Sequence, residues 1–181
     1  MLRLTIELVP EFWDEGKEQF IAPETVTLSL EHSLISVSKW ESKWCKSFLH
    51  TKELTDEETI DYVKCMTLTP NVDTEVYERL SAANIREIRA YISAPMTATT
   101  FSEDKNKKPN REIITSELIY WWMIALNIPF ECQKWHLNRL LTLIRVCNVK
   151  NEPPKKTSKR DIMARNAALN AARRQQLNTK G

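Results

Sequence analysis

The sequence predicts a mainly α-helical fold, in which an N-terminal β-hairpin packs on a helical domain with a central antiparallel helix pair, followed by a basic C-terminal helical tail. Three observations lead to this prediction. Near the N-terminus apolar and polar residues alternate, which is the period of a half-buried strand. From Ser33 onward apolar residues recur every three or four positions, which is the period of a helix. After Pro153 large apolar residues become sparse and cations dominate.

The predicted hairpin rests on two alternating segments. Their apolar members are Leu2, Leu4, Ile6 and Leu8 in the first segment, and Val26, Leu28 and Leu30 in the second. The connection between them, PEFWDEGKEQFIAPE (Pro10–Glu24), is expected to be a polar link with Gly16 at its middle. A lone hairpin is only marginally stable in water, so it must pack on the helices or pair with another chain.

The first predicted helix runs from an N-cap at Ser33 through Phe48. It places Trp40 and Trp44 one turn apart on one face. Two such rings could hold a base or a sugar. We expect instead that they pack in the core or in a subunit interface, which is the commoner use of paired tryptophans.

Further helices follow as far as Pro95. Thr55 and Glu58 form a capping box that opens a helix reaching Met66. Shorter helices are expected over Glu75–Leu80 and Ala82–Ile92. The polar stretch that comes next, residues 97–111, is expected to be an exposed loop.

Residues 112–150 should form the centre of the fold. The helix ending at Leu126 is apolar nearly all round, so neighbours should cover it on several sides. Pro129 suits the first turn of a new helix, which is expected over Glu131–Asn148 with one polar stripe. The short link between the two helices predicts an antiparallel pair.

The charge distribution divides the chain into a globular domain, residues 1–152, and a basic tail, residues 153–181. The tail holds eight cations and one anion, a net charge of +7, whereas the rest holds 18 cations and 23 anions, a net charge of −5. Such asymmetry indicates an interacting tail. The alternative is self-neutralisation, with the tail lying on its own globular domain.

Composition argues against several classes of protein. The longest apolar run, LIYWWMIAL (Leu118–Leu126), falls short of the roughly 20 residues that a membrane span needs. The start of the chain does not read as a signal peptide, and the four cysteines are scattered without a C-x-x-C pair, as in reduced cytosolic proteins. The two glycines, Gly16 and Gly181, cannot build a phosphate-cradling loop.

We considered three sites that could carry chemistry. Cys132 and His136, four residues apart on one predicted helix, could share a metal ion, but no spacing supplies the remaining ligands. The same two residues could form a nucleophile–base pair, but their neighbours are apolar. Glu117 could be a carboxylate with a raised pKa, but one such residue is not a mechanism. We therefore expect no enzymatic activity, no cofactor and no metal.

The tail could bind nucleic acid, a membrane or a protein. Binders of single-stranded nucleic acid interleave aromatic residues with cations, and the tail has no aromatic residue. A membrane-surface helix needs a bulky apolar face, which is also missing. A sparse apolar ridge flanked by arginines favours docking on an acidic, helical protein partner. The residues nominated for this contact are Ile162, Arg165, Leu169, Arg173 and Arg174.

Three segments resemble the tail assembly chaperones of long-tailed (siphovirus-type) bacteriophages. They are LEHSLISVSKWESKW (Leu30–Trp44), YWWMIALNIPFECQKWHLNRLLTLIRVCN (Tyr120–Asn148) and MARNAALNAARR (Met163–Arg174). The resemblance implies a non-catalytic protein of the host cell cytoplasm. It would bind the tape measure protein and tail tube subunits during tail morphogenesis and then leave. Separately from the resemblance, the marginal hairpin and the six tryptophans are compatible with self-association. The alternative is a structural virion component, such as a head–tail connector or neck protein contacting DNA.

Overall fold

The computed structural model of the chain describes residues 1–16, 18–101, 112–151 and 159–178. The chain divides into two compact units, Met1–Asn148 and Val149–Gly181. The domain boundary predicted between residues 152 and 153, and most of the loop predicted over 97–111, lie outside the described residues.

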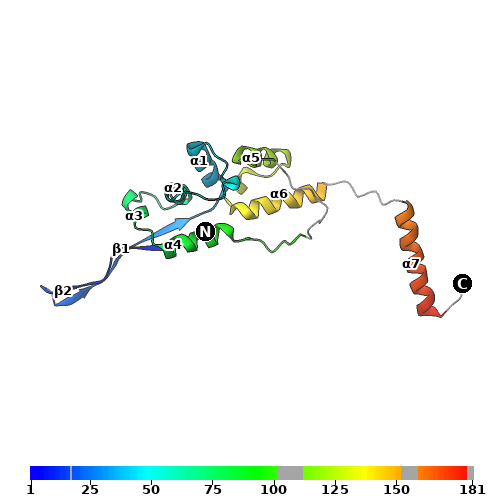
Figure 1. Cartoon of the computed structure of the whole chain (residues 1–181), viewed down its shortest axis with the longest axis horizontal. Coiled ribbons are helices and arrows are strands. Elements are labelled where there is room, and N and C mark those ends of the chain that lie inside the picture. The colour runs from blue at the N-terminus through cyan, green and yellow to red at the C-terminus, as the bar shows by residue number, and fades with distance from the viewer. Residues whose placement is uncertain (17, 102–111, 152–158, 179–181) are drawn as a thin grey trace. The chain divides into compact units, whose positions relative to one another are not determined.

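The structure confirms a mainly helical fold with an N-terminal hairpin (Figure 1). The strands are β1 (Leu2–Val9), β2 (Phe12–Asp14), β3 (Gln19–Ile21) and β4 (Glu24–Leu30). The helices are α1 (Leu34–Trp44), α2 (Asp56–Met66), α3 (Thr74–Glu78), α4 (Ala82–Ser93), α5 (Ser116–Ala125), α6 (Leu137–Asn151) and α7 (Lys159–Leu177). Two short 3-10 helices, η1 (Phe48–His50) and η2 (Phe130–Lys134), complete the described elements. The basic tail thus contains the predicted helix, α7.

The hairpin packs one face on the helices, as the alternation predicts. β1 pairs antiparallel with β4, so that Leu4 lies opposite Leu28. Both side chains are buried, and α4 contacts β1. The chain that leaves α2 covers part of the edge of β4, where the Leu68 amide donates to the Ser29 carbonyl at 2.8 Å. These contacts supply the support that a two-stranded sheet lacks on its own.

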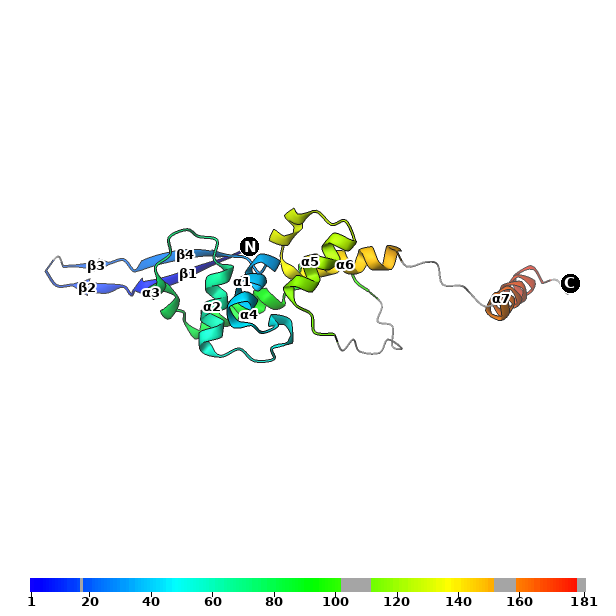
Figure 2. The same cartoon turned by 90° about the horizontal axis from the view of Figure 1, so that it is seen from above.

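The prediction of a polar link over Pro10–Glu24 is wrong. Part of this segment is paired, since β2 and β3 form a second antiparallel ladder with Trp13 opposite Phe20. The two rings meet edge to face, with centroids 4.9 Å apart. Aromatic residues favour strands and pair across them, which explains why the chain continues as a ribbon here. We call residues 7–24 the hairpin arm, and Figures 1 and 2 show β2 and β3 extending away from the helices of the first unit.

The two tryptophans of α1 serve packing, as predicted. Trp40 is completely buried, and its indole N–H donates to the Glu58 carbonyl at 3.1 Å. Trp44 stacks on Trp40 and donates to Asp61 at 3.0 Å. Ser33 caps the helix as expected. However, α1 ends before Phe48, because Cys45 adopts the left-handed conformation that terminates helices.

The helix predicted over Glu131–Asn148 is wrong in its first part. Residues 130–134 form the 3-10 helix η2, with Pro129 as its N-cap, and α6 begins only at Leu137. His136 instead pairs with Ser33 in an isolated β-bridge, and the Leu137 amide donates to the His32 carbonyl at 2.7 Å. These tertiary hydrogen bonds replace the helical ones. Cys132 and His136 therefore lie on different elements.

Candidate protein-binding surfaces

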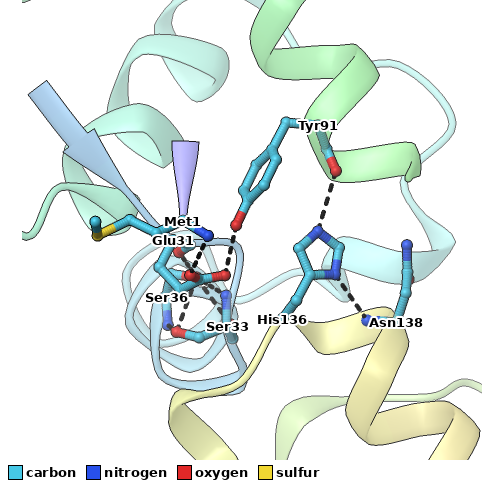
Figure 3. A network of polar contacts seen from close by, with 7 residues as sticks. All are labelled: Met1, Glu31, Ser33, Ser36, Tyr91, His136 and Asn138. Carbon is cyan, nitrogen blue, oxygen red and sulfur yellow. Dashed lines mark hydrogen bonds and ion pairs between the residues drawn. The ribbon is translucent and has the colours of Figure 1, made fainter. Parts of the chain in front are cut away.

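The residues singled out for chemistry hold the core together. Cys132 is buried in η2, and burial raises the pKa of its thiol, which disfavours the reactive thiolate. His136 accepts from the Asn138 amide at Nδ1 (3.3 Å), so Nε2 carries the proton and donates to the Tyr91 carbonyl at 3.0 Å (Figure 3). Both ring nitrogens are thus occupied by the protein, and His136 is not oriented toward Cys132 as a base.

His136 belongs to a buried polar cluster that joins the hairpin to the helices. The His32 ring lies 5.0 Å from the His136 ring, and its Nδ1 is hydrogen-bonded to the Tyr62 hydroxyl at 2.5 Å. Burial, reinforced by His136, lowers the pKa of His32 to about 3. Burial likewise lowers the pKa of His136. Both histidines are therefore neutral in the folded chain near neutral pH.

Glu31 connects this cluster to the start of the chain. Its carboxylate accepts from the Tyr91 hydroxyl at 2.7 Å and pairs with the Met1 amino group at 2.9 Å (Figure 3). We interpret the cluster as structural, because its polar groups bond to one another and to backbone atoms.

Glu117 does not have the raised pKa considered from the sequence. It lies exposed in the first turn of α5, where its own backbone N–H and the side chains of Thr115 and Ser116 lower its pKa. Among residues 1–16, 18–101, 112–151 and 159–178, no group of three or more His, Cys, Asp and Glu side chains is placed to hold a metal ion.

The outer face of α5, formed by Trp121, Ile124 and Ala125, is open to solvent. Trp121 and Ile124 are each 60% exposed, contrary to the expectation that this apolar helix is covered on several sides. α5 packs mainly on α1, and it buries only the side that carries Ile119 and Met123. A large apolar surface left in water is typical of a protein-binding site.

A groove between α2 and α4 offers a second apolar surface. It has a cavity of about 530 Å³ with Phe48, Tyr62, Ile85 and Ile88 in its lining and Lys52, Glu53 and Arg89 beside them. A further cavity of about 270 Å³, lined by Ile60, Tyr77 and Leu80, shares Thr59, Ile85 and Arg89 with the first. Apolar lining beside charged residues is the chemistry of grooves that accept the apolar face of a partner helix.

The tail residues nominated from the sequence all lie on α7, and every described side chain of α7 is exposed. Ile162 and Leu169 are 46% and 47% exposed. At about 100° per residue, Ile162, Leu169 and Arg173 fall on one face with Arg165 beside them, whereas Arg174 lies about 120° away from Ile162. The helix thus brings four of the five residues together.

Two further apolar residues of α7 were missed by the sequence analysis. Met163 and Leu177 are 74% and 72% exposed, more than either ridge residue. They lie off the ridge, which is why a search for one stripe did not include them. The sequence could have identified them as bulky apolar residues in a helix otherwise rich in alanine, asparagine and arginine.

The hairpin arm was also missed, since its segment was expected to be a polar link. Phe12 and Trp13 are about half exposed and Phe20 is 67% exposed. Glutamates at positions 11, 15 and 18 lie exposed around them. The signal was available as two pairs of large apolar residues, Phe12-Trp13 and Phe20-Ile21, at the spacing of facing strands.

No family model matches the chain, and no curated protein or solved structure shows significant similarity to it. In the part of the chain that the structure describes, none of the helices has the length and apolar character required to span a membrane.

Proposed function

We propose that this protein is a tail assembly chaperone of a long-tailed bacteriophage, which binds the tape measure protein and tail tube subunits in the host cytoplasm without catalysing a reaction. The observation that carries the proposal is the exposure of α7, in which Ile162 and Leu169 are about half exposed and the cations are exposed beside them. The three segments that resemble this family, including Met163–Arg174 within α7, support the same proposal.

The energetics of α7 favour a binding role. Because every described side chain of α7 is exposed, its helical structure depends largely on intrinsic propensity. The alanines of α7 provide that propensity, but the helix still exposes four large apolar side chains. Docking on an acidic helical client would bury Ile162 and Leu169 and place Arg165 and Arg173 beside carboxylates.

The first unit would add apolar surface for the same client. The outer face of α5 presents Trp121, a residue type enriched in the energetic centres of interfaces. The groove between α2 and α4 has the apolar lining and flanking charges suited to a helical segment. A long helical client could engage several of these surfaces and gain affinity from their number.

Co-expression with the tape measure protein tests the proposal. The full chain should keep that client soluble, and Ile162→Ser/Leu169→Ser should lower its soluble fraction. Ala164→Ser/Ala171→Ser is the matched control, because it places the same side chain on the opposite side of α7. Equal solubility with and without the full chain would contradict the proposal.

The alternative, a permanent virion or neck component contacting DNA, makes a different prediction. A chaperone that leaves should be absent from purified particles, whereas a connector should be present in stoichiometric copies. Quantitative mass spectrometry of purified virions separates the two, and stoichiometric recovery would overturn the chaperone proposal.

A further inference from the structure

We propose that this protein self-associates head to tail, with α7 of one copy bound to the acidic hairpin arm of a second copy. This inference does not depend on the proposed function. It rests on the charges of the two segments and on the apolar side chains that each leaves in solvent.

The hairpin arm accounts for the negative charge of the first 152 residues. Residues 7–24 contain six acidic residues and one lysine, a net charge of −5, which equals the net charge of residues 1–152 as a whole. Glu7, Glu11, Glu15, Glu18 and Glu24 are all exposed. The rest of that region is electrically balanced, so the arm is where a cationic partner would be attracted.

The arm also has apolar surface to bury. Trp13 and Phe20 form one cross-strand pair, and Phe12 projects from the opposite face of the ribbon. Phe20 is 67% exposed. A two-stranded ribbon with exposed aromatic residues is stabilised when a partner covers it.

α7 complements the arm in charge and in chemistry. It carries five cations and one anion, a net charge of +4. Arginine guanidinium groups stack on tryptophan and phenylalanine rings, and Met163 and Leu177 provide flexible apolar contacts.

The two segments also match in length. α7 has 19 residues, which span about 28 Å in a helix. One side of the arm, from Glu7 to Glu15, spans about 26 Å in a strand. A head-to-tail contact leaves one arm and one α7 unoccupied at the ends of each assembly. Each assembly can therefore add further copies, and its mass should grow as the protein concentration rises.

Sedimentation velocity over a wide range of concentration tests the proposal. The full chain should show a rising weight-average mass at low salt and a smaller rise at physiological salt, because exposed charges are screened. Arg173→Glu/Arg174→Glu removes the positive charge of α7. Glu15→Lys/Glu18→Lys removes most of the negative charge of the hairpin arm without altering the aromatic pair. Each should weaken association by about tenfold or more.

Two controls make the result specific. Glu57→Lys/Glu87→Lys changes the net charge by the same amount as the arm variant, at exposed sites outside the arm and outside the groove lining, and should leave association intact. An equimolar mixture of the two charge variants supplies one native α7 and one native arm, which should form a one-to-one complex. This complex should not grow, because the altered α7 has a net charge of 0 and the altered arm a net charge of −1, so the two no longer attract each other.

The possible outcomes separate clearly. A mass that stays monomeric at every concentration contradicts the proposal, including the case in which α7 binds the arm of its own chain. Association that survives both charge variants also contradicts it and indicates another surface, such as the outer face of α5. Circular dichroism of each variant verifies that the fold is retained.

Discussion

Acidification should destabilise this protein well above the pH at which carboxylates titrate, because His32 is buried in its neutral form. His32 has an ordinary pKa of 6.5, and burial beside His136 lowers it to about 3 in the folded chain. Below pH 6.5 the unfolded chain therefore binds a proton at His32 that the folded chain does not bind. The stability present above pH 6.5 is lost progressively as the pH falls toward 3.

The magnitude follows from the two pKa values. Between about pH 7.5 and about pH 5, His32 alone should lower the free energy of unfolding by about 2 kcal/mol. The lowered pKa of His136 adds to the loss in the same direction. In a domain of this size, about 2 kcal/mol corresponds to a fall in the unfolding midpoint of about 4–8 °C.

Urea denaturation at a series of pH values, followed by tryptophan fluorescence, measures this directly. His32→Asn should reduce the pH dependence between about pH 7.5 and about pH 5 by about 2 kcal/mol. It should also lower stability at neutral pH, since it removes a buried ring and changes the bond to Tyr62. His50→Asn, at an exposed histidine, is the matched control variant.

A free energy of unfolding that is flat over this pH range would refute the reasoning, as would an unchanged slope in His32→Asn. Either result would mean that His32 takes up its proton in the folded chain without cost.

Three further predictions concern the fold. Trp40→Phe removes a buried indole and its bond to the Glu58 carbonyl, and should lower the free energy of unfolding by about 2–3 kcal/mol in urea denaturation. Trp121→Phe, at an exposed tryptophan, should lower it by less than about 0.5 kcal/mol. Glu41→Gln should cost about 1–3 kcal/mol by the same assay, because the carboxylate accepts from the Phe48 and Ser116 amides at 2.8 and 2.7 Å and the variant replaces one acceptor by a donor. Removal of residues 153–181 should leave the thermal midpoint of the remaining chain unchanged in calorimetry at concentrations where the full chain is monomeric, since α7 belongs to a separate compact unit.

The features that sequence reasoning predicted correctly are those set by local physics. The alternation from Leu2 to Leu8 identified β1, and the N-cap at Ser33 and the capping box at Thr55 identified the starts of α1 and α2. Each signal lies within a few residues of the element it specifies. The role of Trp40 in packing was also predicted, because a large ring on the apolar face of a helix is usually buried.

The wrong predictions depended on contacts distant in sequence. The break before α6 is set by bonds between Leu137 and His32, about a hundred residues earlier in the chain. The exposure of Trp121 depends on how few elements reach α5, which its own apolarity does not reveal. The hairpin arm is the exception, because its ladder joins neighbouring residues: its acidic residues indicated a polar link, whereas Trp13 and Phe20 pair across two strands.

The central proposal is that α7 presents a cationic, partly apolar surface to a client protein. The most direct measurement is the soluble fraction of the tape measure protein when it is co-expressed with the full chain or with residues 1–152. The proposal predicts a large soluble fraction with the full chain and a clearly smaller one with the shortened chain. Equal fractions with both would contradict it.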